Sequence, residues 1–261
     1  MKCRYSFRLD TYGCGCAHNC SYCYAKSLLD FRGFWHPEEP AVADLFKIER
    51  KIQTLVPYSV IRLGGMTDCF QPIERKQKVT FETIKLLNKY KIQYLIVTKS
   101  DMVASNEYIN IMDPDLAHIQ ITVTTTDDSF SRSYEYAPPS SLRIAAIEKL
   151  FKDGFDVQVR ISPFIPQFLD YKIINQIKCN KALVEFLRVN SFIKSQFIID
   201  YSDYTHKEGG YSHLPLLKKI ELIKQINGFK EVSVCEDCSE AYDYWRKNFN
   251  PNAIDCCNLK F

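Results

Sequence analysis

The sequence predicts an α/β fold: an incomplete (β/α)6-type TIM barrel with a short Cys-rich C-terminal extension. Apolar runs of strand length alternate with longer segments of helical periodicity, the pattern of parallel β-α units. Six or seven such units fit in 261 residues, since single barrels of about 250 residues are common. No linker rich in proline, glycine or serine interrupts the chain. We therefore expect a barrel at residues 1–234 and the extension at 235–261.

Strands and helices are expected in alternation along the chain. The expected strands are residues 5–9, 59–63, 93–98, 119–124, 155–161, 184–189, 196–199 and 231–234. The expected helices are residues 24–30, 42–55, 79–90, 104–112, 140–152, 170–179 and 215–226. Barrels of this kind carry their chemistry at the C-terminal ends of the strands.

Three cysteines after the first expected strand form the most specific motif. Cys16, Cys20 and Cys23 have the spacing C-x3-C-x2-C within residues 16–23, here called the cysteine loop. Thiolates at short fixed intervals bind iron–sulfur clusters, and three of them leave one iron of a [4Fe–4S] cluster open. A zinc site fits less well, because it needs a fourth ligand and the nearest histidine is His18 inside the loop. Disulfides are disfavoured by the odd number of cysteines, eleven.

This spacing, with the aromatic Tyr22 before the last cysteine, resembles the radical S-adenosylmethionine (SAM) superfamily. The resemblance implies that SAM chelates the open iron through its amino and carboxylate groups. It also implies that the reduced cluster cleaves SAM to a 5′-deoxyadenosyl radical, which abstracts hydrogen from a substrate. In this family the backbone at the Tyr22 position meets the adenine of SAM.

Further SAM contacts implied by the resemblance follow the ends of the expected strands: Gly64, Gly65, Met66, Lys99, Thr124 and Arg160. Glycine allows close backbone approach to a ligand, although a glycine pair after a strand also forms ordinary tight turns. The Lys99 ammonium suits the SAM carboxylate, or it extends to solvent at a strand end. Arg160 suits a carboxylate, or it neutralises Asp156 or Glu135.

Within the superfamily, residues 10–170 resemble the spore photoproduct lyase-like branch, also called DNA-repair-photolyase-like. The resemblance rests on Cys-Ser-Tyr-Cys-Tyr, Gly-Met-Thr-Asp-Cys-Phe-Gln-Pro-Ile-Glu-Arg, Val-Thr-Lys-Ser-Asp, Thr-Thr-Thr-Asp-Asp, Glu-Tyr-Ala-Pro-Pro and Arg143. It implies that Tyr24 relays a hydrogen atom from a nearby cysteine, for which Cys69 is the candidate. Cys69 follows Asp68, whereas the branch carries its cysteine before this segment.

A second group of cysteines lies near the C-terminus. Cys235 and Cys238 form a C-x2-C pair after the last expected strand, and Cys256 and Cys257 follow. Such a group predicts an auxiliary iron–sulfur cluster or a structural zinc. Adjacent cysteines rarely both bind one metal well, so one of Cys256 and Cys257 is left out in the three-thiolate alternative. We expect Cys3, Cys14 and Cys179 to be structural.

The branch resemblance implies a nucleobase or nucleotide substrate, within DNA or free. A flipped base needs aromatic stacking, and Tyr201, Tyr204, His206 and Tyr211 surround the pair Gly209-Gly210. The same residues could simply cap the core. The alternatives are radical chemistry on a peptide or small metabolite, and a non-catalytic iron–sulfur or zinc scaffold. An enzyme of this kind would need an external electron donor of the flavodoxin or ferredoxin type.

Composition limits the partners and the compartment. The formal net charge of +3 allows a nucleic acid without implying one. No apolar run approaches the ~20 residues that span a bilayer, and Met1-Lys2-Cys3-Arg4-Tyr5 lacks the apolar region of a signal peptide. Unpaired, cluster-spaced cysteines need a reducing compartment, so we expect a cytoplasmic protein without a membrane anchor.

Overall fold

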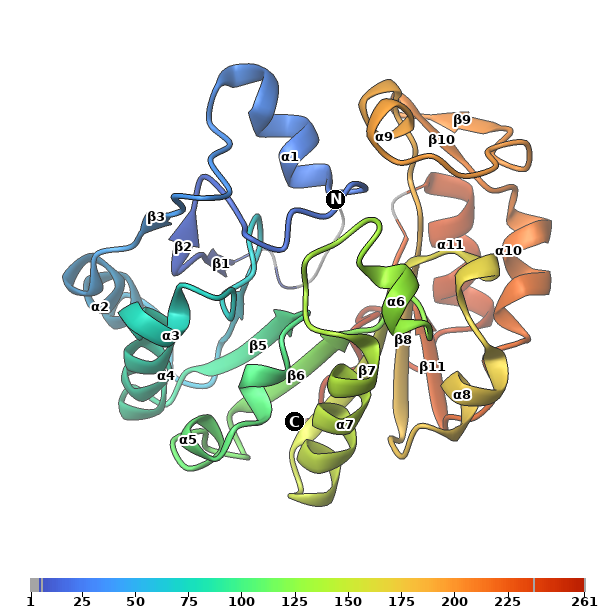
Figure 1. The fold of residues 1–261 in the computed structure, drawn as a ribbon. Helices are drawn as coiled ribbons and strands as arrows, with labels where there is room; N and C mark the ends of the chain where they lie inside the picture. Colours follow the sequence, from blue (N-terminus) through green and yellow to red (C-terminus); the bar gives the residue numbers. More distant parts are fainter. Residues whose placement is uncertain (1–4, 6, 237, 261) are drawn as a thin grey trace.

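The computed structural model describes residues 5, 7–236 and 238–260, so Cys3 lies outside the described residues. Its framework is a parallel sheet of seven strands in the order β1-β4-β5-β6-β7-β8-β11 (Figure 1). The strands are β1 (Arg8–Leu9), β4 (Val60–Leu63), β5 (Gln93–Thr98), β6 (Ala117–Thr122), β7 (Asp156–Phe164), β8 (Lys181–Phe186) and β11 (Glu231–Val234). The edge strands β1 and β11 do not pair with each other. The predicted α/β fold with an open, incomplete barrel is therefore confirmed.

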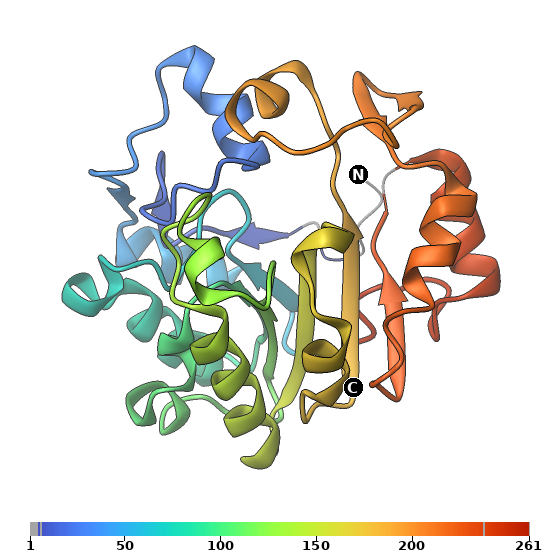
Figure 2. The same cartoon turned by 45° about the vertical axis from the view of Figure 1, so that its right-hand side comes forward.

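Most of the helices cover the outer face of the sheet, whereas those at residues 24–29 and 191–196 lie above the ends of the strands (Figures 1 and 2). In chain order they are α1 (Tyr24–Leu29), α2 (Leu45–Gln53), α3 (Glu74–Gln77), α4 (Val79–Lys89), α5 (Asn106–Ile109), α6 (Asp128–Ser131), α7 (Ser140–Lys152), α8 (Tyr171–Gln176), α9 (Ser191–Gln196), α10 (Leu216–Ile223) and α11 (Ser239–Asn248). Short 3-10 helices lie at Asp30–Arg32, Asp101–Ala104 and Pro166–Phe168. Helix α7 is typical, since Ala146, Ile147 and Leu150 form its buried stripe.

Alternation along the strands separates the core from the barrel interior. In β4, Ile61 and Leu63 join the main hydrophobic core, whereas Arg62 faces a cavity inside the barrel. In β6, Ile121 belongs to the core and Gln120 to the cavity. In these two strands the outer face is therefore apolar and packs on the helices, while the inner face is polar. In β5, by contrast, the cavity is lined by the apolar Leu95 and Val97.

The C-terminal tail packs against the end of this interior where the strands begin. Lys181, the first residue of β8, donates from its ammonium to the Asn258 carbonyl at 2.9 Å, and the Lys260 amide donates to Asp156 at 3.1 Å. The hydroxyl of Tyr5, just before β1, donates to Asp255 at 2.6 Å. Figure 2 shows the C-terminus beside the lower end of β8. The tail thus brings Cys256 and Cys257 to the barrel interior.

One expected strand, residues 196–199, is wrong. Helix α9 ends at Gln196, and Phe197 is buried against Tyr22 and Tyr134, while Ile198 is 90% exposed. These residues alternate between buried and exposed positions although they pair with no strand. The periodicity of a sequence does not show whether a segment has a partner strand.

Two antiparallel strand pairs and four helices, α3, α6, α9 and α11, were not predicted. The first strand pair joins β2 (Tyr12–Gly13) to β3 (Ala41–Val42), with the cysteine loop and α1 between them in the chain. The second pairs β9 (His206–Glu208) with β10 (Tyr211–His213). Gly209 and Gly210 have φ of +60° and +81°, as a two-residue hairpin turn requires. Helix α11 is anchored by buried Ala241 and Trp245.

Among the described residues, none of the helices has the length and apolar character needed to cross a lipid bilayer.

Candidate active site at the C-terminal ends of the strands

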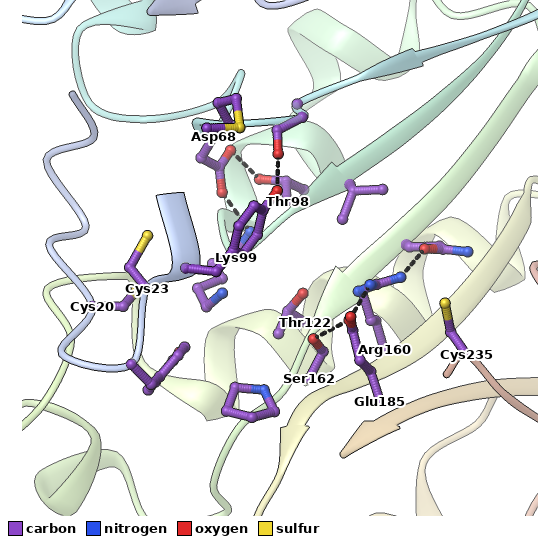
Figure 3. A pocket seen from close by; sticks show the side chains of 18 of the residues that line it. Cys20, Cys23, Asp68, Thr98, Lys99, Thr122, Arg160, Ser162, Glu185 and Cys235 are labelled. Carbon is purple, nitrogen blue, oxygen red and sulfur yellow. Dashed lines mark hydrogen bonds and ion pairs between the residues drawn. The ribbon is translucent and has the colours of Figure 1, made fainter. Parts of the chain in front are cut away.

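A cavity lies where the parallel strands end, beside the cysteine loop (Figure 3). The predicted site residues that line it are Cys16, Cys20, Tyr22, Cys23, Tyr24, Gly64, Gly65, Met66, Lys99, Arg160, Cys235 and Cys257. Four predicted site residues are not among its lining residues: Cys69, Thr124, Cys238 and Cys256. The cavity therefore gathers most of the candidates from both ends of the chain.

The cysteine loop folds as two consecutive tight turns. The Asn19 amide donates to the Cys16 carbonyl at 3.0 Å, and the Cys23 amide donates to the Cys20 carbonyl at 3.1 Å. Cys23 then caps α1, because its sulfur accepts from the Lys26 amide at 3.4 Å. These turns hold all three cysteines in the lining of one cavity.

Residues 134–136, which lie between α6 and α7, anchor the cysteine loop. The Ser21 amide donates to the Tyr134 carbonyl at 2.8 Å, and the Tyr136 amide donates to the His18 carbonyl at 2.7 Å. Between them, the Glu135 carboxylate accepts from the Tyr22 hydroxyl and pairs with Arg143, and both side chains of this ion pair are fully buried. The motif residues Glu135 and Arg143 thus position the cysteine loop.

The donor set fits an iron–sulfur cluster. Burial raises the pKa of Cys16 to about 12 and raises the pKa of Cys20 well above its usual range. Without a metal these thiols are therefore protonated at neutral pH. A bound cation deprotonates a coordinating thiol, so three soft sulfur donors on one loop suit iron.

The backbone at residues 64–66 is held closely by neighbouring parts of the protein. Gly64 has φ of +78°, and a Cβ there would lie 2.8 Å from the Val97 carbonyl oxygen. Asp10 accepts from the amides of Gly65 and Met66 at 2.7 and 3.2 Å. The Tyr24 hydroxyl donates to the Gly65 carbonyl. These contacts fix the segment beside the cysteine loop.

Lys99 lies between the cysteine loop and the end of β5. Its ammonium is 5.5 Å from the centre of the Tyr22 ring. Burial disfavours its charge, but Cys20 and Glu135 outweigh this effect and raise the pKa of Lys99. Lys99 is therefore a cation held within the cavity rather than one extended into solvent.

His18 and Asp68 form a pair that the sequence did not predict. The Nε2 atom of His18 is 3.3 Å from Asp68 Oδ2, and both side chains are buried. Asp68 also accepts from the Thr98 hydroxyl and the Lys99 amide, each at 2.7 Å. Burial opposes the Asp68 charge, yet His18 and these hydrogen bonds lower the pKa of Asp68 to about 2. His18 thus ties the cysteine loop to the end of β5.

Arg160 is paired with neither Asp156 nor Glu135. It forms an ion pair with Glu185 and donates to the Gln120 amide oxygen at 2.8 Å (Figure 3). Asp156 instead pairs with His118 and Lys181. The sequence did not predict three other charged residues of the cavity lining: Arg62, Glu185 and Arg188. The available signal was a charged residue at an alternate position within an otherwise apolar strand, as in Val-Ile-Arg-Leu and Leu-Val-Glu-Phe.

Cys69 and Thr124 lie outside the cavity lining. Cys69 is 1% exposed in the main hydrophobic core, and burial raises the pKa of its thiol. Thr124 lies beyond the end of β6, and its hydroxyl contacts Tyr134 and Glu135 at 3.0 Å each. Thr122, two residues earlier, is in the lining instead.

The four C-terminal cysteines divide into two groups. The Cys256 thiol contacts those of Cys235 and Cys257, and these contacts raise its pKa. Cys238 instead faces the β9–β10 hairpin, with its sulfur 3.3 Å from His206 Nε2. Cys235 and the cysteine loop lie on opposite sides of the cavity (Figure 3).

Of the four aromatic candidates in the late loop, one reaches the cavity. Tyr211 is in the lining, with the Arg188 guanidinium 5.4 Å from its ring centre. Tyr201 and Tyr204 pack against each other with ring centres 5.7 Å apart, and His206 faces Cys238.

Some known proteins resemble this chain in sequence and others in fold. An uncharacterized protein of Methanocaldococcus jannaschii, MJ0683, is 27% identical over 192 residues, which cover 68% of this chain and 69% of that protein. A spore photoproduct lyase variant with bound AdoMet and dinucleoside spore photoproduct has a TM-score of 0.64 at 13% identity, covering 87% of this chain and 74% of its own.

Other solved structures with this fold include a methylornithine synthase and a protein with a bound peptide. Methylornithine synthase matches with a TM-score of 0.56 at 12% identity, over 87% of this chain and 63% of its own. The enzyme anSMEcpe, with bound AdoMet and a peptide, matches with a TM-score of 0.51 at 9% identity, over 94% of this chain and 62% of its own. Residues 11–170 match the family model of the Radical SAM superfamily. That match spans more than half of the sequence and includes the cysteine loop, and the chain therefore belongs to the radical SAM superfamily.

Proposed function

We propose that the protein is a radical SAM enzyme that modifies or repairs a nucleobase or nucleotide, free or within DNA. The observation that carries this proposal is the composition of one cavity. It places the cysteine loop beside the cationic side chains of Arg62, Arg160 and Arg188 and the ring of Tyr211. A phosphate-bearing substrate suits the arginines, and a base suits the aromatic ring.

Superfamily membership implies a [4Fe–4S] cluster, SAM and a reductant. Cys16, Cys20 and Cys23 would hold the cluster, while Gly64, Gly65, Met66, Lys99 and the backbone at Tyr22 would hold SAM. When bound and reduced, this pair supplies a 5′-deoxyadenosyl radical that abstracts hydrogen. We assign the hydroxyl contact to SAM to Thr122 instead of Thr124, because Thr122 lines the cavity.

Tyr24 is the candidate for relaying a hydrogen atom, since its side chain lies in the cavity lining and its hydroxyl contacts Gly65. Cys69 lies in the core, so we do not assign it a part in the relay. Arg160 is occupied by Glu185 and Gln120, which favours a role in shaping the substrate side over one in binding SAM.

Isotope transfer tests the substrate class. The reconstituted protein would be incubated anaerobically with SAM, dithionite and one deuterated pool: DNA oligonucleotides, nucleotides, a peptide digest or amino acids. We expect deuterium in 5′-deoxyadenosine with the oligonucleotide or nucleotide pool. Transfer only from peptides or amino acids would assign the enzyme to the alternative substrates, and no 5′-deoxyadenosine at all would contradict the radical chemistry.

A matched pair of variants tests the substrate side of the cavity. Tyr211→Leu should weaken nucleotide binding by about 1–3 kcal/mol, the contribution of one stacked base. Tyr58→Leu is the control, because Tyr58 is 64% exposed just before β4, at the far end of that strand. Equal affinities in the two variants would remove Tyr211 from the proposed base-binding surface.

We further propose that Cys235, Cys256 and Cys257 bind an auxiliary iron–sulfur cluster on the other side of the cavity. Although Cys256 and Cys257 are adjacent in sequence, both are included because the Cys256 thiol contacts those of Cys235 and Cys257. We propose a flavodoxin or ferredoxin as the external electron donor. Arg160 lies close enough to these thiols to stabilise their negative charge. Reconstituted protein should contain about eight iron atoms, two [4Fe–4S] clusters. Cys257→Ala should retain about four, while exposed Cys14→Ser should retain all. Wild-type protein with only four irons would contradict the second cluster.

A further inference from the structure

A histidine, a glutamate and a cysteine converge outside the cavity lining, where the β9–β10 hairpin meets the start of α11. Cys238 Sγ is 3.3 Å from His206 Nε2 and 3.2 Å from Glu208 Oε2, and these nitrogen and oxygen atoms are 3.6 Å apart. His206 and Glu208 come from β9, and Cys238 immediately precedes α11. Segments 30 residues apart thus contribute to one triangle of ligand atoms.

The size of this triangle matches a metal site. Zinc–ligand bonds of about 2.0–2.3 Å in tetrahedral geometry place neighbouring ligand atoms about 3.3–3.6 Å apart. One thiolate, one imidazole and one carboxylate are donors that zinc accepts. All three potential ligand atoms lie within 4.8 Å of one another, so a single ion can reach each of them without rearrangement of the backbone.

The carboxylate is held in the orientation that a ligand needs. Glu208 Oε1 accepts from the Ser239 amide at 2.9 Å and from the Ser239 hydroxyl at 2.7 Å. Oε2 also accepts from the Ser239 amide, at 3.1 Å, and is the oxygen that faces Cys238 and His206. Hydrogen bonds that hold a carboxylate while one of its oxygens faces the other ligand atoms are typical of the groups surrounding metal ligands.

We propose that His206, Glu208 and Cys238 bind one zinc ion. This site is separate from the Cys235, Cys256 and Cys257 group and goes beyond the proposed function. The side chains of His206 and Glu208 are 33% and 34% exposed, which leaves the fourth coordination position open to water.

The ion would clamp the hairpin to α11. Glu208 is the Cα partner of Tyr211 across the hairpin, so fixing Glu208 also fixes the strand that carries Tyr211 into the cavity lining. Ligation that joins distant segments stabilises their arrangement. The zinc therefore has a positioning role and no part in the radical chemistry.

The test is element-specific and uses the whole protein. Wild-type protein is reconstituted anaerobically with iron and sulfide, supplied with zinc and desalted, and its zinc content and zinc-edge X-ray absorption are measured. We expect about one zinc per chain with one sulfur at about 2.3 Å and nitrogen or oxygen ligands at about 2.0–2.1 Å. Absence of bound zinc, or a shell of three or four sulfurs, would overturn the proposal without any variant.

Variants then assign the ligands. His206→Gln and Cys238→Ser should each lower zinc binding to below a tenth of the wild-type level. Cys235→Ser and His36→Gln are the matched controls, since Cys235 lines the cavity and His36 is exposed. Both controls should keep their zinc. Loss of zinc in Cys235→Ser with retention in Cys238→Ser would instead assign the metal to the cavity-side cysteines.

Discussion

The cysteine loop and the C-terminal cysteine region both bring cysteines together, but they do so in different ways. In the loop, Cys16, Cys20 and Cys23 lie within eight consecutive residues and line the same cavity. In the C-terminal region, Cys235 lines the cavity, whereas Cys238 turns to the hairpin three residues later. Cys256 and Cys257 reach Cys235 only because the tail folds back against the barrel.

This difference shows when the spacing of cysteines predicts that they share one site. Two tight turns hold the cysteine loop, so its spacing largely fixes where its thiols point. Cys235 directly follows strand β11, whereas Cys238 directly precedes helix α11, so their C-x2-C spacing does not keep them together. A spacing motif predicts a shared site reliably only where the backbone between the cysteines is one local structure.

The largest expected effect concerns the loop itself. Cys16→Ala, Cys20→Ala or Cys23→Ala should each abolish 5′-deoxyadenosine formation, because two thiolates cannot retain the cluster with its SAM-binding iron in place. Anaerobic assays with SAM and dithionite measure this. Cys14→Ser, an exposed cysteine beside the loop, should keep full activity. A fully active Cys20→Ala enzyme would contradict the assignment of the cluster to the cysteine loop.

The anchoring of the loop predicts a large effect on stability. Arg143→Met leaves Glu135 as an unpaired buried charge, which should cost about 3–5 kcal/mol of unfolding free energy. Urea unfolding measures the difference. Lys85→Met breaks an exposed pair with Glu82 and should change stability by less than about 1 kcal/mol. Equal losses in the two variants would mean that residues 134–136 do not hold the cysteine loop.

On the loop side of the cavity, Lys99→Ala should weaken SAM binding by about 1.5–3 kcal/mol, the contribution of a hydrogen bond to a charged group. Equilibrium binding of SAM to the reconstituted protein tests this. The iron content should remain that of the wild type, which separates loss of SAM binding from loss of the cluster. Unchanged affinity would contradict a role for Lys99 in binding SAM.

The smallest expected effect concerns Glu185, on the C-terminal side of the cavity, and the pH dependence of stability. Burial opposes the Glu185 charge, but Arg160, Ser162 and the neighbouring arginines lower its pKa from 4.5 to about 2. The depressed pKa contributes stability at pH values above 4.5, and this contribution is lost as the pH falls toward 2. Glu185→Gln should therefore flatten the pH dependence of the unfolding midpoint in that window. An unchanged pH profile would contradict the buried ion pair.

Much of the fold was predictable because local patterns determine it. Residues 93–98, 140–152 and 231–234 form the predicted elements with the predicted bounds, since each is an apolar, alternating or helix-periodic run. Residues 196–199 failed because alternation of burial arises without a strand partner. The β9–β10 hairpin could have been predicted from Gly209-Gly210 between two short polar–aromatic runs.

The sequence by itself determined the chemistry of the cysteine loop and the superfamily, because the ligands of one cluster are local in the chain. Only the tertiary structure decided that Arg160 pairs with Glu185, that Cys69 is buried in the core, and that Cys238 leaves its C-x2-C partner for His206 and Glu208. These outcomes depend on which strands become neighbours and on which face each side chain lies. Both follow from packing of the whole sheet against its helices and tail, and no short stretch of sequence contains that information.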